Sequence, residues 1–542
     1  MFLPCRVLKL LAVSFAPAAA GQDRLSPLIS ERFDVAIIGG GIIGCGIARD
    51  AALRGLRVAL FERADFGSGT TSASTRIVHG GLRYLEMLDF RLVRLDLRER
   101  ETLLRIAPHL VQPLRFLIPF LSGAPVSPLK LRLGLTLYDA LSFDRSLPGH
   151  RRLTAAEARE SERALRGSDL RGGAAYYDAR VDLPERLALE NALDAEMHGA
   201  VIRNYCEVVR TTLTNGTASG VRVRDTLTGQ EIDIAARIVV NATGAWWERV
   251  AAAATGSRPH RVRTTKGIHI VCPPLTDGAM VLFSDIDRRL MFAIPRAGQT
   301  WIGTTDTDYD GDPAAVRATR EDVEYLIGSV RTLFPSLTMA DVLHTTAGVR
   351  ALVTRPGTAS SVSRMHKVAS DEPLPGVISV LGGKITGYRA IAEDVTDAVC
   401  RRAGIDRRCT TAERPLPGAD GHSGAGATAA IPPGLRMYGA RARQVIALTD
   451  SAPHLADPLS ATVTDIGAQV RYGVRVEHCL RVSDFIRRRT LLGASADQGW
   501  EAAPAVASLM ADELGWSTAR ADAELDAYRA DIDSSRAFRN ER

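Results

Sequence analysis

The sequence has few cysteines, few lysines and no long apolar run. The arrangement of these residues argues against several classes of protein. The seven cysteines are scattered without a C-x-x-C pair, which argues against a disulfide framework or a zinc site and fits reduced thiols. No stretch reaches the roughly 18–20 apolar residues of a membrane-spanning helix. Lysine occurs only five times among 68 basic residues, so a lysine inside a glycine-rich motif indicates a need for its compact ammonium group.

Charge of either sign is not in large excess. The formal net charge is +6 over 542 residues, which suits an anionic substrate or a lipid surface but is no nucleic-acid signature. We therefore expect no nucleic acid as a partner, and we expect no metal. The length allows two to four domains, each with a substantial core.

We exclude residues 1–30 from the predicted fold as a leader. Residues 1–22 contain no acid, and two basic residues precede a short apolar run, Leu10 to Ala16. With Ala18-Ala-Ala20 behind it, this run resembles a weak secretory signal. A disordered leader or a start codon assigned too early is an equal alternative, because the run is short and interrupted by Ser14.

A dinucleotide-binding motif follows directly. An apolar strand, Val35 to Ile38, leads into Gly39, Gly41 and Gly44, which form G-x-G-x-x-G at the start of an Ala-rich helical pattern. These glycines allow a tight turn, a close approach to a pyrophosphate and close packing of helix on strand. Glu62 ends the next strand, 18 residues after Gly44, where an acid should bind an adenosine ribose. The motif alone does not distinguish NAD from FAD.

Three later segments of small or hydroxyl-bearing residues are predicted to contact the same cofactor, and they favour FAD. The first, from Phe66 to Glu86, is dense in glycine, serine and threonine, and a flexible surface loop is its alternative. The second ends the strand 238–241, and the third follows the strand 377–381. From these segments and strand 206–209 we predict that the cofactor contacts Thr70, Thr71, Ser72, Ser74, Val208, Ala242, Gly244, Gly383, Lys384, Ile385 and Thr386.

The order of the elements predicts an α/β fold with a discontinuous Rossmann-like FAD-binding domain. Strand-rich sequence between its pieces predicts an antiparallel substrate-binding cap, and the Ala/Arg-rich end of the chain predicts a helical domain. The expected FAD-binding parts are residues 31–90, 171–247 and 345–400. The expected cap comprises 91–170 and 248–344, and the helical domain 401–542.

Two segments of the cap combine apolar and basic residues. Residues 90–106 predict a helix that either lies on anionic lipid or, as we prefer, is solvated and carries many ion pairs. Residues 114–143 hold large apolar residues, several basic ones and almost no acid. Such a segment is typical of a membrane interface, and a core helix is the alternative. We interpret Trp246-Trp247 as core packing.

The chain resembles the FAD-dependent glycerol-3-phosphate dehydrogenases, a branch of the amino-acid-oxidase-like flavoproteins. The resemblance spans about residues 33–500 and rests on specific motifs. These are Thr71 to Glu86, Ile302-Gly-Thr-Thr-Asp306 with Gly311-Asp-Pro313, Gly348-Val-Arg350, Leu381-Gly-Gly-Lys-Ile-Thr386 with Tyr388-Arg389, and Arg487-Arg-Arg-Thr490.

The resemblance implies FAD, oxidation of sn-glycerol 3-phosphate to dihydroxyacetone phosphate, and electron transfer to a membrane quinone. It also implies peripheral attachment to the cytoplasmic face of the cell membrane, commonly as a homodimer. Three positions depart from the family pattern. Arg76 stands where Lys is usual, Ala351 where Pro is usual, and Gly387 where a second Thr is usual.

Oxidation of a secondary alcohol requires a group that removes the hydroxyl proton, and histidine suits this role near neutral pH. His79, in a Gly-Gly turn beside the hydroxyl-rich segment, is the first candidate, and His269 the second. A phosphate dianion requires fixed cations. We expect Arg350 to bind it, with Arg83, Tyr84, Arg364 and Lys384. Lys384 would also place its charge near the flavin, so we count Arg350 and Lys384 among the catalytic residues.

Other functions share parts of this pattern. A glycerol-3-phosphate oxidase, which passes electrons to O₂, is the nearest alternative, and the motifs do not separate the two. An amine or amino-acid oxidase would need a carboxylate site and fewer cations. A non-catalytic flavin-binding adaptor is disfavoured because His79, Arg350 and Lys384 are all present.

Overall fold

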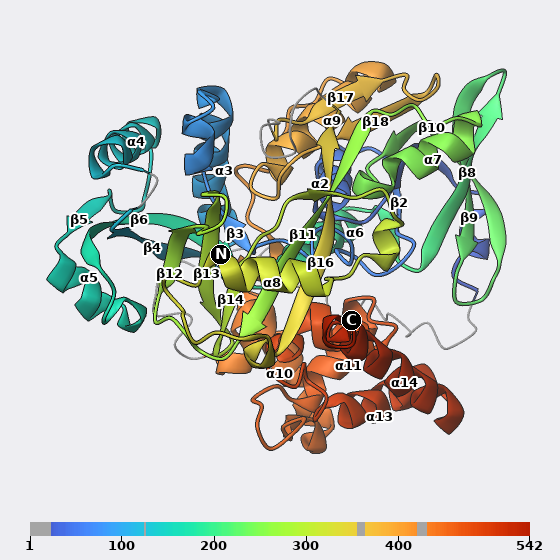
Figure 1. Ribbon diagram of the computed structural model, residues 1–542. Coiled ribbons are helices and arrows are strands. Elements are labelled where there is room, and N and C mark those ends of the chain that lie inside the picture. Colours follow the sequence, from blue (N-terminus) through green and yellow to red (C-terminus); the bar gives the residue numbers. More distant parts are fainter. Residues whose placement is uncertain (1–22, 124–125, 355–363, 420–430, 542) are drawn as a thin grey trace, which may run out of the picture.

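The computed structural model describes residues 23–123, 126–354, 364–419 and 431–541. It shows an α/β core with two sheets and a helical C-terminal domain (Figure 1). The predicted leader ends earlier than expected. Residues 1–22, including the signal-like run, lie outside the described residues. Leu25 and Leu28 are buried in the core, and Arg24 pairs with Asp225, so residues 23–30 belong to the fold.

The first sheet carries the dinucleotide motif. Its strands are ordered β17-β18-β10-β1-β2-β7, and the hairpin β8–β9 extends from β10. Strands β18, β10, β1, β2 and β7 are parallel, as the apolar strands predict. The bounds are β1 Arg32–Ile38, β2 Val58–Phe61, β7 Val201–Arg203, β8 Cys206–Thr214, β9 Thr217–Asp225, β10 Glu231–Asn241, β17 Lys367–Ser370 and β18 Val377–Leu381.

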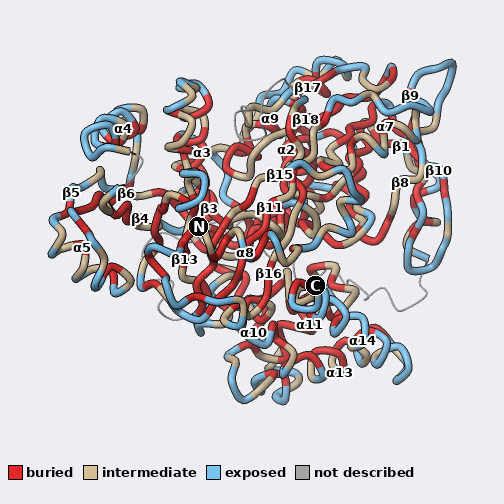
Figure 2. The backbone as a smooth tube through the Cα atoms, viewed as in Figure 1, coloured by how far each residue is buried: buried red, intermediate tan, exposed pale blue. Residues whose placement is uncertain are grey.

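Alternate residues of β1 enter different cores. Val35 and Ile37 pack with three helices on one face of the sheet. Ala36 and Ile38 pack on the other face with the β8–β9 hairpin. Such two-sided burial is the reason that parallel strands read as continuous apolar runs. β1 is buried from Val35 to Ile38, and the interior of the molecule is largely red in Figure 2. The helices are α2 Ile42–Leu53, α6 Pro184–Met197 and α9 Tyr388–Ala403.

The second sheet is largely antiparallel and forms the cap. Its order is β15-β11-β14-β13-β12-β4-β6-β3, with β16 on β11 and β5 on β6. The helix α8 (Arg320–Ser329) covers the face that carries Ile268 and Ile270. The bounds are β3 Ile77–Val78, β4 Val111–Leu121, β5 Arg151–Leu153, β6 Leu170–Val181, β11 Val262–Cys272, β12 Ala279–Phe283, β13 Leu290–Arg296, β14 Gln299–Gly303, β15 Thr307–Asp308 and β16 His344–Val353.

Two strands lie in a different sheet from the one we expected. Segments 171–247 and 345–400 were predicted to join the dinucleotide sheet, but β6 pairs with β4, and β16 pairs with β11. Both pairings are long-range and antiparallel, and strand pairing over such distances leaves no local signal in the sequence.

The helices of the cap also differ from expectation. Residues 90–106 form α3 (Phe90–Ile106) with the expected ion pairs, yet its acids Asp96 and Glu99 are buried rather than solvated. Glu99 binds Arg389 of α9. Residues 114–143 are not one element, because β4 ends at Leu121 and the separate helix α4 spans Pro128–Leu141.

The C-terminal domain is helical, as predicted, and is joined to the FAD-binding part by buried ion pairs. Arg186 of α6 binds Glu477 at 2.8 Å, and Arg489 binds Asp65 at 2.7 Å, with all four side chains shielded from solvent. The longer helices are α10 Ala442–Ser451, α11 Gly467–Val476, α13 Ala503–Leu514 and α14 Thr518–Ser534.

Candidate active site

At each of the three motif glycines, a Cβ would either collide with nearby backbone or point into open space. A Cβ on Gly44 would lie 1.9 Å from the carbonyl oxygen of Gly39, so α2 touches the turn itself. Gly39 has φ +101° and lies against Ala242 at the end of β10. Gly41 caps the N-terminus of α2 and is open apart from Thr71. The exposed N–H groups of this helix end form an anion site.

Glu62 is held at the tip of β2 by backbone donors. Its carboxylate accepts hydrogen bonds from the N–H groups of Gly40 and Ala64 at 2.7 and 2.9 Å. Burial raises the pKa of this carboxyl above its ordinary value, and the two backbone hydrogen bonds oppose that rise. The side chain lies in the wall of the main cavity, at the end where a ribose would lie.

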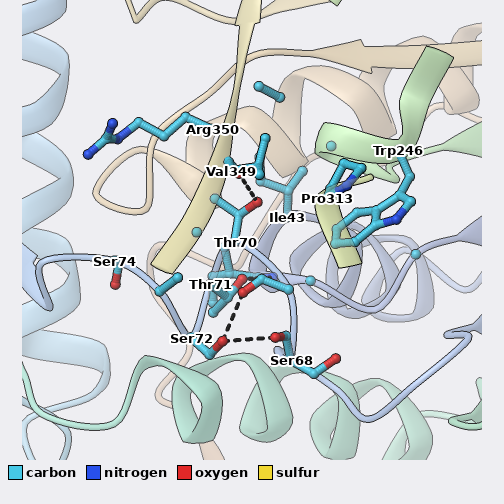
Figure 3. A pocket seen from close by; sticks show the side chains of 18 of the residues that line it. Ile43, Ser68, Thr70, Thr71, Ser72, Ser74, Trp246, Pro313, Val349 and Arg350 are labelled. Carbon is cyan, nitrogen blue, oxygen red and sulfur yellow. Dashed lines mark hydrogen bonds between the residues drawn. The ribbon is translucent and has the colours of Figure 1, made fainter. Parts of the chain in front are cut away.

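The main cavity, of about 1140 Å³, joins the two sheets. Figure 3 shows the hydroxyl-rich segment along one side, with Thr70 bonded to the carbonyl of Val349 and Ser72 to that of Ser68. The segment is therefore an ordered wall rather than a free loop. The predicted residues that line the cavity are Gly39, Gly41, Glu62, Thr70, Thr71, Ser72, Ser74, His79, Arg83, Tyr84, Val208, Ala242, Gly244, Arg350, Arg364, Gly383, Lys384 and Ile385.

This cavity fits an extended dinucleotide such as FAD. Gly41 leaves the backbone of the turn open, and the same cavity is lined by Lys384 and Arg350. Three predicted residues do not line it. Gly44 packs α2 on the turn, Thr386 is buried beneath His79, and His269 lies behind Thr75.

A cluster of arginines surrounds one buried carboxylate at the cap end of the cavity. Asp306 accepts hydrogen bonds from Arg350 at 3.2 Å and Arg364 at 3.0 Å, and Arg289 lies 3.9 Å away. Although burial opposes it, these three arginines lower the pKa of Asp306. Arg83 borders the same group. One carboxylate cannot neutralise the three guanidinium groups of Arg289, Arg350 and Arg364, so the cluster fits a further anion.

Arg350 lies flat across the backbone of β11. A Cβ on Gly267 would lie 2.2 Å from its guanidinium, so only glycine leaves this path open. Thr304 accepts a hydrogen bond from Arg350 at 2.8 Å. Burial lowers the pKa of Arg350 to about 10, which leaves it charged at neutral pH.

Sequence reasoning missed Arg289, Gly267, Thr304 and Asp306 as site residues. Asp306 and Thr304 stand inside the motif 302–306, so that motif was an available signal. Arg289 lies in a turn before β13 with no pattern around it. Trp246 lines the cavity beside Gly69 and Arg63, whereas Trp247 is fully buried. Our interpretation of the pair as core packing therefore holds for Trp247 alone.

Lys384 is fixed by two short contacts. Its ammonium donates to the carbonyl oxygen of His79 at 2.9 Å and to Asp96 of α3 at 2.7 Å. Burial raises the pKa of Asp96 to about 6, against the pull of Lys384, so the pair is ionic at neutral pH. Lys384 also lies 5.2 Å from the centre of the Tyr84 ring. The compact charge is thereby positioned at the Gly382–Gly383 turn.

The two candidate bases are both neutral in this structure. His79 faces the cavity, and burial followed by Lys384 holds its pKa well below the ordinary value. His269 is buried on the sheet face that carries Arg350, 3.0 Å from the Thr75 hydroxyl and 3.4 Å from that of Thr346. Burial, Arg350 and Arg76 lower its pKa to about 3. A neutral imidazole is the form that accepts a proton.

The three departures from the family pattern have clear positions. Arg76 forms a two-pronged pair with Glu185 at 2.7 and 2.8 Å. Ala351 lines the main cavity next to Arg350. At Gly387 an added Cβ would lie 3.5 Å from Asp96 Oδ1, an oxygen without a hydrogen-bond partner among the described residues. A threonine there would place its hydroxyl beside that carboxylate.

Comparison with known proteins identifies relatives of this chain along nearly its whole length. Family models match residues 34–396 (FAD dependent oxidoreductase) and 409–521 (C-terminal domain of alpha-glycerophosphate oxidase). The glycerol-3-phosphate dehydrogenase of Synechocystis sp. is 38% identical over 92% of this chain and 95% of its own. The aerobic glycerol-3-phosphate dehydrogenase of Staphylococcus saprophyticus is 33% identical over 94% and 96%.

Among solved structures, the glycerol-3-phosphate dehydrogenase from Bacillus halodurans complexed with FAD aligns with a TM-score of 0.76 at 29% identity. The alignment covers 94% of this chain and 96% of that one. The glycine turn, the ordered hydroxyl-rich wall and the arginine cluster thus occur in a chain related along nearly its whole length to these enzymes. It belongs to the FAD-dependent glycerol-3-phosphate dehydrogenase family and uses FAD as its cofactor.

Proposed function

We propose that this protein oxidises sn-glycerol 3-phosphate to dihydroxyacetone phosphate and passes the electrons through FAD to a membrane quinone. The observation that carries the proposal is the arginine cluster around Asp306, which opens into the same cavity as the FAD glycines. A phosphate dianion matches an excess of guanidinium groups, whereas the single carboxylate of an amino acid would need fewer.

The cluster gives the substrate a direction. Arg350 and Arg364 would turn from Asp306 toward the phosphate, supported by Arg83, and Tyr84 would close over the site. The glycerol carbons would then extend toward the Gly382–Gly383 turn and Lys384. Bound FAD supplies the hydride acceptor. Glu62 and the α2 N-terminus would hold its adenosine and pyrophosphate, and Lys384 would place a positive charge near its ring.

The alcohol proton needs an acceptor at the same place. We assign this role to His79, whose ring borders the cavity and whose pKa keeps it neutral. His269 is the alternative, and it would receive the proton through the hydroxyl of Thr75. Thr386 supports the first arrangement, because it accepts from the N–H of His79 at 3.2 Å and fixes the turn.

The proposed reaction can be tested on the purified, FAD-loaded protein. Glycerol 3-phosphate should bleach the flavin absorbance without oxygen, and unphosphorylated glycerol at the same concentration should do so far more slowly. Bleaching by an amino acid, or by glycerol as readily as by its phosphate, would contradict the proposed substrate. The electron acceptor is tested separately, by the peroxide formed in air against the rate of quinone reduction. A stoichiometric peroxide yield without quinone reduction would identify an oxidase instead.

We further propose peripheral attachment to the inner face of the cell membrane through α4. Among the described residues, no helix is both long and apolar enough to cross a bilayer. Leu129, Leu133 and Leu137 form an exposed stripe along α4, and the first two are 76% and 71% exposed. Lys130 and Arg132 lie beside them, and α4 stands out as exposed in Figure 2. Apolar and basic residues side by side suit an anionic bilayer surface.

The homodimer that the family resemblance implies stays a prediction.

Replacing Leu129 and Leu133 together by glutamine should weaken binding to anionic vesicles by about tenfold or more, because each leucine would lose its burial in the acyl region. Co-sedimentation measures the binding. Activity with a soluble dye as acceptor should be unchanged, since both side chains point away from the core. Leu213→Gln, on the exposed hairpin β8–β9, is the matched control. Equal losses in both proteins would exclude α4 as the attachment surface.

A further inference from the structure

A second cavity, of about 210 Å³, lies where three parts of the chain meet. The hydroxyl-rich segment supplies Ser72 and Ala73, the cap sheet supplies Trp301 and His344, and the C-terminal domain supplies Arg487. Thr346 lines this cavity, and its hydroxyl lies 3.4 Å from His269. The cavity adjoins the main one, since Ser72 and Ala73 line both. Trp301, His344 and Arg487 have no part in the proposed reaction.

Buried donors face this cavity without partners. His344 is 2% exposed, and neither of its ring nitrogens has a hydrogen-bond partner among the described residues. The same holds for the indole nitrogen of Trp301, for Nε of Arg296, and for Nε and Nη2 of Arg487. A buried donor left unpaired is unfavourable, so a group of them along one cavity points to a ligand with acceptor oxygens.

The charges around the cavity are unbalanced. Arg76 is neutralised by Glu185, Arg488 by Asp65 and Asp484, and Arg317 lies 3.9 Å from Glu541. Asp531 is the remaining acid in the lining, and it is exposed at the edge. Arg296 and Arg487 have no carboxylate partner in the part of the chain that the structure describes.

Two basic groups in the wall of this cavity have lowered pKa values. Burial, followed by Arg76, lowers the pKa of Arg296 to about 9, against the pull of Asp182 and Glu185. Burial, followed by Arg487 and Arg536, lowers the pKa of His344 to about 3. Burial disfavours both charged forms, and the neighbouring cations add to that effect. An anion in the cavity would oppose both shifts.

We propose that the second cavity is a binding site for a small phosphate-class oxyanion, held by Arg296, Arg487, His344 and Trp301. Guanidinium groups match the oxygens of such an anion. The volume is below the roughly 300–1,000 Å³ of pockets for drug-sized ligands, which suits inorganic phosphate or a small phosphomonoester. Because residues of the cap sheet and of the C-terminal domain bind it, the anion would join the C-terminal domain to the sheet that carries His269.

Equilibrium dialysis of the FAD-loaded protein against radiolabelled inorganic phosphate tests this site. We expect two phosphates per chain. Arg350→Gln should remove the active-site phosphate and leave the other. Arg487→Gln and Arg296→Gln should each weaken the second by about 10- to 100-fold, the effect of losing a charged donor. Glycerol 3-phosphate added to the Arg350→Gln protein shows whether a phosphomonoester displaces the second phosphate or only inorganic phosphate binds there.

The control is Arg222→Gln on β9, which breaks an exposed ion pair with Asp233 of β10 and should retain both phosphates. FAD content and unfolding temperature confirm that each variant is folded. If neither cavity variant folds, the comparison of wild type with Arg350→Gln still decides. A single phosphate per wild-type chain, lost in Arg350→Gln, would overturn the proposal. So would two phosphates retained by folded Arg487→Gln and Arg296→Gln proteins. Loss in Arg487→Gln but not in Arg350→Gln would uphold this site while removing Arg350 from the phosphate role.

Discussion

Replacement of Arg350 by alanine should raise the KM for glycerol 3-phosphate by about 30- to 1,000-fold, because a buried charged donor pair contributes on the order of 2–4 kcal/mol. The much weaker activity with unphosphorylated glycerol should stay within about twofold, since glycerol offers the arginine no anion. Steady-state kinetics with both substrates and one soluble acceptor measure the difference. The selectivity follows from the geometry, in which Arg350 reaches Asp306 and Thr304 but no cofactor-binding glycine.

Two further variants make the Arg350 result specific. Arg222→Ala, in an exposed ion pair on β9, should leave both substrates unchanged. Arg350→Lys should recover only part of the affinity, because lysine lacks the planar fork of guanidinium. A similar loss for glycerol and for its phosphate would show that Arg350 supports the fold of the site and does not bind phosphate.

Replacement of His79 by alanine should slow flavin reduction by about 10²- to 10⁴-fold, the usual contribution of a general base. FAD should stay bound, because the backbone of His79 makes the contacts with Lys384 and Thr386, while its ring packs edge-on to Phe292. Anaerobic stopped-flow mixing with glycerol 3-phosphate measures the rate. The substrate concentration at half-maximal rate should change little, since the ring carries no charge for the phosphate.

His269→Ala and Thr75→Val separate the two candidate bases. If His79 is the base, both variants should reduce flavin within about tenfold of the wild-type rate. An unchanged rate in His79→Ala, with a large loss in both other variants, would move the role to His269 and its link through the Thr75 hydroxyl. FAD absorbance and unfolding temperature, compared with wild type, show whether a slow variant has lost its cofactor instead.

Local patterns predicted the dinucleotide end of the molecule well. The turn at Gly39, the helix from Ile42 and the acid Glu62 lie within a single strand–helix–strand unit, and the structure has each in its expected place. Such a unit is specified by residues close together in the chain, since buried strands read as apolar runs and the turn needs glycine. The helical C-terminal domain was predictable for the same reason.

The substrate end was predictable only in part. Arg350 was found because it stands in a recognisable motif, and the motif 302–306 also holds Asp306, whose role nevertheless went unrecognised. Arg289 was recognised as a site residue only from the structure, in which β13 pairs with β14 and Arg289 lies near Asp306. The acids of α3 were expected in solvent, yet Asp96 is buried and accepts a hydrogen bond from Lys384. The two residues are 288 positions apart in the sequence. A charged residue in the sequence does not show whether its side chain is buried, because an aspartate is written the same way in either environment.

By itself the sequence determined the cofactor-binding unit, the family and the residue types available for a phosphate, because these depend on short segments whose chemistry is local. Only the tertiary structure decided which cations share one cavity, that His269 lies behind Thr75, and that His344, Arg296 and Arg487 enclose a second cavity. These arrangements arise from long-range antiparallel pairing and domain packing. The physical reason is that burial and electrostatic imbalance are properties of groups brought together in space.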